Sequence, residues 1–197
     1  EVWAKGDIAF HAGTAEYAYA MLGHGGSRIS GSIKGGAGES IQVTSEEGSI
    51  HFMADPTADV LNAFAQLGHG GFLSTGSTEA AITVTALNGG VAFQGGGTGG
   101  VGGGVISHGS YAQIGHGGYQ SPGDHRGAIH VTATGPEGIS FTAGNGYFAS
   151  AQIGHGGREA VGNHSGDITV DAGTAALEFE GGTGQNYTAA RIGHGSS

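Results

Sequence analysis

Five histidines in one recurring motif are the residues of this sequence best suited to chemistry. Each lies in the five-residue sequence Leu/Ile-Gly-His-Gly-Gly, here called the signature motif, whose last copy ends in Gly-Ser. Imidazoles brought into one row could ligate a transition metal, take up protons near pH 6 or hold an extended ligand. The five are His24, His69, His116, His155 and His194.

The same row could equally be structural. Stacked imidazoles can hydrogen-bond to a neighbouring ring or to a backbone carbonyl, and the flanking glycines would let the backbones approach closely. A buried row must stay largely neutral, because adjacent imidazolium charges repel. We therefore predict a structural ladder of these five histidines. Metal or other ligand binding by the same five is the alternative, and no cofactor is expected.

The remaining histidines do not follow a regular pattern. His125 and His164 share one phase of consecutive repeats, but Thr78 stands near that phase in the preceding repeat, so we expect two exposed loop residues. Three others alternate with apolar residues and are expected on a solvated outer face: His11, His51 and His130.

A polysaccharide-active enzyme would need carboxylates gathered in one groove, where they could transfer protons at a sugar. The acidic residues fall instead in different repeats and phases: Glu46, Glu47, Asp55, Asp59, Glu178 and Glu180. No nucleophile or metalloprotease motif occurs either. We predict no enzymatic activity and keep a polysaccharide-active protein as the least favoured alternative.

Charge and composition exclude further classes. The 197 residues include 6 basic and 16 acidic ones, for a formal net charge of −10, so no positive surface is available for nucleic acid. The chain has no cysteine and therefore no thiolate ligand or nucleophile. No apolar run is long enough for membrane insertion, and the start at Glu1, without a signal segment, indicates a processed or excised piece.

The elements that position the histidines are revealed by internal repetition. The steps between signature histidines are 45, 47, 39 and 39 residues, by subtraction of their numbers. Two alternating segments recur in phase with the motif: Ile-x-Val-x-Ala, as at 129–133, and Ile-x-Phe-x-Ala, as at 139–143. Period-two alternation bounded by glycine predicts strands, hence three short strands per repeat. One domain over 1–197 is expected, with repeats of approximately 1–26, 27–71, 72–118, 119–157 and 158–197.

Alternation within the third segment predicts which way the histidine points. Ala112, Ile114 and His116 share one parity, which places the ring on the apolar inner face. A glycine with positive φ could reverse this. The other parity is mostly polar and is expected outside: Met21, Gln66, Gln113, Gln152 and Arg191.

Repeated strands without a helical period predict an all-β, parallel β-solenoid, in which each repeat buries the apolar face of the next. Two points stay open in the sequence. A repeat could form one coil of about 39 residues or two of about 20. Residues 84–91 could also form a hairpin around Asn88-Gly89-Gly90, which would make the sheets antiparallel.

The two alternating segments, Ile-x-Val-x-Ala and then Ile-x-Phe-x-Ala-Gly, resemble the repeats of large secreted bacterial exoproteins of the filamentous haemagglutinin and autotransporter-passenger type. The resemblance covers nearly the whole chain, although the signature motif is not part of that family's general pattern. It implies a right-handed β-helix on the cell surface, secreted as an adhesin shaft or fibre, with a host or matrix surface receptor as partner. It implies no catalytic residue.

The order of segments also predicts self-association. The sequence starts in the first segment type and ends just after the third, so the end of one copy presents the phase that the start of another would continue. Open sheet edges must be capped, covered or paired. We therefore expect end-to-end stacking.

Overall fold

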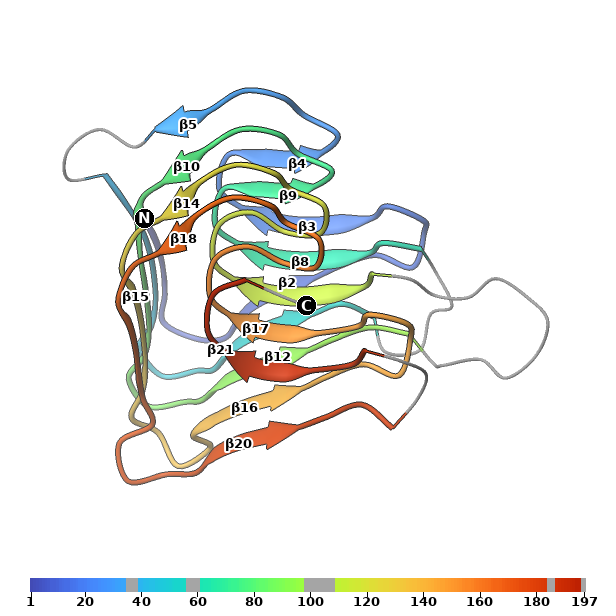
Figure 1. The fold of residues 1–197 in the computed structure, drawn as a ribbon. Helices are drawn as coiled ribbons and strands as arrows, with labels where there is room; N and C mark the ends of the chain where they lie inside the picture. The colour runs from blue at the N-terminus through green and yellow to red at the C-terminus, as the bar shows by residue number, and fades with distance from the viewer. Residues whose placement is uncertain (35–38, 56–60, 98–108, 184–186, 196–197) are drawn as a thin grey trace.

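The computed structural model describes residues 1–34, 39–55, 61–97, 109–183 and 187–195 (Figure 1). These residues form parallel strands in stacked sheets and contain no helix, so no helix in this part of the chain could cross a membrane. The class is the predicted one: all-β, with the strand arrangement of a parallel β-solenoid. Asp59 lies outside the described residues, and so does most of the glycine-rich insertion at 95–104.

Three five-stranded sheets hold the three predicted segments. The first sheet contains β1 (Val2–Ala4), β6 (Ser40–Ser45), β11 (Ala81–Ala86), β15 (Ile129–Ala133) and β19 (Ile168–Asp171). The second sheet contains β2 (Ile8–His11), β7 (Ile50–Met53), β12 (Val91–Gln94), β16 (Ile139–Thr142) and β20 (Leu177–Glu180). The third sheet contains β3 (Tyr19–Leu22), β8 (Phe64–Leu67), β13 (Tyr111–Ile114), β17 (Ala151–Ile153) and β21 (Ala190–Ile192).

Between each signature motif and the next first-sheet strand, the chain makes an excursion that we call the side lobe (Figure 1, upper part). Its short strands were not foreseen from the sequence, because they are only two or three residues long and lack alternation. They are β4 (Gly25–Ser27), β5 (Ile33–Lys34), β9 (Gly70–Phe72), β10 (Thr78–Glu79), β14 (His125–Arg126) and β18 (His164–Ser165).

Strand pairing resolves both open points of the sequence. Ile82 is in register with Ile129, and Ile129 with Ile168, so successive partners are 47 and 39 residues apart and the stretch between them is one coil, not two. The hairpin alternative is wrong, because β11 and β12 lie in different sheets and each pairs in parallel with strands from neighbouring coils.

The core lies between the inner faces of the three sheets. Its clearest feature is a column of stacked phenylalanines with ring centroids 4.7 to 5.1 Å apart and interplanar angles of 7° or less. Aliphatic columns run beside it, and in the central coils these side chains are fully buried. The column consists of Phe10, Phe52, Phe93, Phe141 and Phe179.

The third sheet departs from the prediction, because both of its faces are covered. Gln66, Gln113 and Gln152, expected outside, are 0%, 1% and 2% exposed. The side lobe folds over this face and places a second apolar cluster on it, with Phe64, Phe72 and Tyr111 buried together. Alternation shows that a strand has two unlike faces, but it cannot show that another part of the chain covers the polar one.

The glycine before each signature histidine sits where two coils touch. Gly115 has φ +149°, and a Cβ there would lie 1.9 Å from the carbonyl oxygen of Gly154 in the next coil. The equivalent Gly193 in the last coil has φ +146° but nothing within 4 Å of its ideal Cβ. Glycine is therefore required by coil contact as well as by backbone conformation.

We predict that Gly115→Ala lowers the free energy of unfolding by more than about 3 kcal/mol, because a coil must move to admit the methyl group. Gly193→Ala should cost only the backbone strain, about 1–2 kcal/mol. Urea denaturation measures both. Equal costs for the two variants would show that coil contact does not select this glycine.

Candidate functional site: the histidine ladder

The five signature histidines stack in one column. Successive ring centroids are 5.2, 4.9, 4.8 and 4.9 Å apart, and the rings from His69 onward are within 6° of parallel. His116 and His155 are 0% exposed and His69 is 6% exposed, so the central rings lie inside, as the strand pleat predicts. His24 and His194, at the two ends of the column, are less covered.

Hydrogen bonds link each histidine to the next coil. The backbone N–H of one signature histidine donates to Nδ1 of the next, at 2.9 Å from His24 to His69 and from His69 to His116, and at 3.0 Å from His116 to His155 and from His155 to His194. A nitrogen that accepts a hydrogen bond carries no proton, so each accepting ring is the tautomer protonated at Nε2.

The Nε2–H group closes the coil to which the histidine belongs. His116 donates to the carbonyl of Ala80 at 2.9 Å, His155 to Gly127 at 2.8 Å and His194 to Gly166 at 2.8 Å. These carbonyls lie just before β11, β15 and β19. Each ring therefore ties the end of a third-sheet strand to the start of the first-sheet strand of the same coil, at the point where the side lobe leaves and returns.

Burial keeps this ladder neutral. Desolvation, together with a smaller effect of neighbouring histidines, lowers the pKa of His69 and of His155 to about 4. Desolvation and the rings of His155, His69 and His125 also lower the pKa of His116 well below its usual value. A proton added at Nδ1 would displace the backbone N–H and place a charge within 5 Å of the next ring.

A metal ion finds no arrangement of ligands in the described part of the chain. No group of three or more His, Cys, Asp or Glu side chains is placed there to hold one. In His116 and His155 both ring nitrogens are occupied, one by a backbone N–H and the other by its own proton directed at a carbonyl. A metal could bind these rings only by displacing one of those hydrogen bonds.

Two further polar columns lie beside the ladder, and both are buried where the sequence predicted exposed residues. The buried glutamines donate to backbone carbonyls of the signature glycines, as Gln113 does to Gly154 at 2.8 Å and to Gly156 at 3.1 Å. Recurrence of glutamine at one phase was the signal available in the sequence. These amides satisfy carbonyls of the tight turn that would otherwise be buried without a partner.

The expectation that His125 and His164 are exposed is wrong for His125, which is 0% exposed, while His164 is partly buried. Their rings stack 5.0 Å apart in the side lobe. His125 Nδ1 lies 2.8 Å from Thr78 Oγ1, and its Nε2 lies 2.9 Å from the carbonyl of Ser121. The column thus includes the threonine that seemed to break the pattern, because a hydroxyl can partner an imidazole across coils.

The other residues singled out from the sequence stay apart. His11 and His130 are exposed and His51 is partly exposed. Glu46 and Glu47 follow β6, Asp55 follows β7, and Glu178 and Glu180 are exposed on β20, so the described acids stand on separate segments.

Comparisons with protein-family models, with curated proteins and with solved structures found no match to this chain. The class of protein therefore rests on the chain's own geometry: an all-β protein of parallel strands in stacked sheets, with polar ladders at the coil closures.

We predict that His116→Ala lowers the free energy of unfolding by about 3–5 kcal/mol. The substitution leaves a cavity, and it leaves the N–H of His69 and the carbonyl of Ala80 without a hydrogen-bond partner. Chemical denaturation measures the effect. His130→Ala, on the exposed side of β15, should change stability by less than about 0.5 kcal/mol. Comparable losses in the two variants would argue against the ladder as a structural element.

We also predict that stability falls in mild acid. The unfolded histidines have a pKa near 6.5 and the folded His69 and His155 near 4. The unfolded state therefore takes up protons first, so stability is complete well above pH 6.5 and decreases as the pH falls toward 4. The loss reaches up to about 3 kcal/mol for His155 and is smaller for His69, whose charge solvent screens more. Urea midpoints between pH 5 and 7 isolate this effect from most carboxylates. A flat profile over that window would contradict it.

Proposed function

We propose that this protein is a structural, extracellular β-solenoid of five repeats, a right-handed shaft on a cell surface whose copies stack head to tail. The right-handed coil, the surface location and an adhesin role with a host or matrix receptor follow from the resemblance of its strand segments to secreted bacterial exoproteins. Head-to-tail stacking is supported by the contacts and exposure of side chains at the two ends of the described structure.

The C-terminal end presents apolar columns without a cover. Leu177 is 43% exposed, Phe179 45% and Ile192 37%, although the matching residues of the preceding coil, Ile139, Phe141 and Ile153, are almost fully buried. Exposed apolar residues aligned in this way form a surface that gains free energy when another coil covers it.

The N-terminal end presents the same columns in the same register. Ile8, Phe10 and Leu22 pair with Ile50, Phe52 and Leu67 on strands at the edge of their sheets, where Phe10 and Leu22 are partly exposed and Ile8 is 9% exposed. A second copy set one coil spacing below the first would place its Phe10 beneath Phe179 and its Ile8 beneath Leu177. Matching register of the two ends is the single observation that carries the proposal.

The histidine ladder offers complementary groups at the same joint. Within the described residues, nothing donates to Nδ1 of His24, and the backbone N–H of His194 has no acceptor. In a head-to-tail pair, His194 N–H of one copy would donate to His24 Nδ1 of the next, which repeats the contact seen between all successive coils. The polar ladder therefore sets the same direction and register as the apolar columns.

We predict that the protein associates in a concentration-dependent manner and that Phe179→Lys abolishes this association, because a charge would be buried at the joint. Sedimentation velocity measures the association, and electron microscopy should show rods with an axial repeat of about 4.8 Å. Val161→Lys is the matched control, since Val161 is 72% exposed outside the three sheets. Monomers of the unsubstituted chain at high concentration would overturn the stacking proposal.

A further inference from the structure

A column of large side chains on the outer face of the third sheet stops before the last two coils. Tyr19, Phe64 and Tyr111 stack with ring centroids 5.1 and 5.0 Å apart. By the register of β13, β17 and β21, the next two positions of this column are Ser150 and Ala189. Replacement of a ring by a hydroxymethyl and a methyl group leaves an unfilled space at the C-terminal end.

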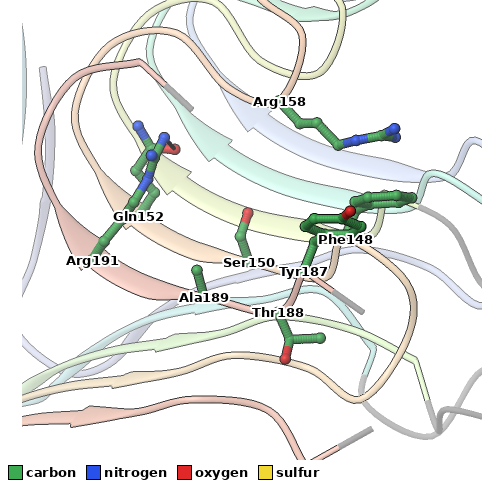
Figure 2. Close-up of a pocket in the computed structure, with 8 residues that line it drawn as sticks. All are labelled: Phe148, Ser150, Gln152, Arg158, Tyr187, Thr188, Ala189 and Arg191. Carbon is green, nitrogen blue, oxygen red and sulfur yellow. Dashed lines mark hydrogen bonds between the residues drawn. The ribbon is translucent and has the colours of Figure 1, made fainter. Parts of the chain in front are cut away.

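A cavity of about 100 Å³ occupies this space (Figure 2). Phe148 and Tyr187 form one wall, with rings stacked 5.1 Å apart and Tyr187 69% exposed. Gln152 and Arg191 lie at the opposite side, with Ser150 between them and the aromatic wall. The cavity thus combines an accessible aromatic face with a hydroxyl and a guanidinium group. It is smaller than most ligand pockets, so it can hold one side of a ligand but cannot enclose it.

Two of the six basic residues of this acidic chain line the cavity, and they differ in what neutralises them. Arg158 pairs with Glu159, donates to the hydroxyl of Tyr119 at 2.9 Å and lies over the ring of Phe148. Its charge is therefore already engaged.

Arg191 has no carboxylate partner among the described residues. It donates to Oε1 of Gln152 at 2.9 Å, and burial lowers its pKa. The preceding coils hold glutamine in this column, at Gln113 and Gln152, so the cation replaces a neutral amide. A partly desolvated guanidinium with spare donors is stabilised by an anion, and its planar fork suits a carboxylate.

We propose that this cavity binds a carboxylate-bearing pyranose, such as the hexuronate unit of an acidic saccharide. The carboxylate would accept hydrogen bonds from Arg191, and the C–H face of the sugar ring would pack on Tyr187, whose ring face is electron-rich. Ser150 supplies a hydroxyl that can bond a sugar hydroxyl. The buried Gln152 amide instead positions Arg191, because its Oε1 accepts from Arg191 while its Nε2 donates to the carbonyls of Gly156 and Gly193. The site uses the surface of the third sheet and does not rest on head-to-tail stacking.

Titration of the protein with sodium D-glucuronate, followed by NMR shifts or calorimetry, tests this site. We expect saturable binding at millimolar concentrations, with D-glucose and acetate each at least tenfold weaker. Arg191→Gln, which installs the residue of the preceding coils, should weaken glucuronate binding at least tenfold. Ser150→Tyr, which continues the aromatic column, should fill the cavity and abolish binding. Both variants should keep the thermal midpoint of the unsubstituted protein within a few degrees.

The control is Arg126→Gln, because Arg126 is an exposed arginine paired with Asp124 in the side lobe. It should bind glucuronate like the unsubstituted protein. Absence of saturable binding, or unchanged binding by a folded Arg191→Gln, would overturn the site. Acetate binding as tight as glucuronate would overturn the sugar as its ligand. Because all these measurements can be made on monomers, failure here is distinguishable from failure of the stacking proposal.

Discussion

Close contact between successive coils at the signature motif is the constraint on which the rest of the structure depends. At this point backbone faces backbone, and the carbonyl of one coil occupies the place that a Cβ of the neighbouring coil would need. Glycine at positive φ is the residue that fits. Once the coils are fixed at this spacing, equivalent side chains come within stacking distance everywhere else, which is why phenylalanine stacks on phenylalanine and histidine on histidine.

Such close backbone contact creates polar groups that water cannot reach, and the ladders satisfy them. The imidazole has an acceptor and a donor on opposite sides of one flat ring, so a single neutral tautomer can accept from the preceding coil and donate across its own coil, as His116 does. The glutamine amides serve the neighbouring carbonyls on the other face of the strand. Hydrogen bonding therefore closes the coils of His116, His155 and His194 without a disulfide.

The places where the ladders end or change are the places where this protein has groups available for binding. In the central coils the phenylalanine column and the signature-histidine column are continued on both sides. At the ends, Phe179 and the histidine groups of the outermost coils have one side open, which favours another coil. At Ser150, Ala189 and Arg191 the column pattern itself changes, and the result is a cavity lined by a cation, Arg191, that has no carboxylate partner in the part of the chain that the structure describes.

The sequence by itself determined the class of fold, because alternation such as Ile129-x-Val131 and the phase of the glycines reflect physical requirements local to a strand or a turn. It also predicted the inward direction of His116, which depends only on the pleat of one strand. Only the tertiary structure decided that Gln113 and His125 are buried, since the side lobe, which covers Gln113 and contains His125, packs through contacts distant in the sequence. Only the tertiary structure also decided that Arg191 and Tyr187 line one cavity, because the side chains around a cavity depend on how neighbouring coils pack against each other.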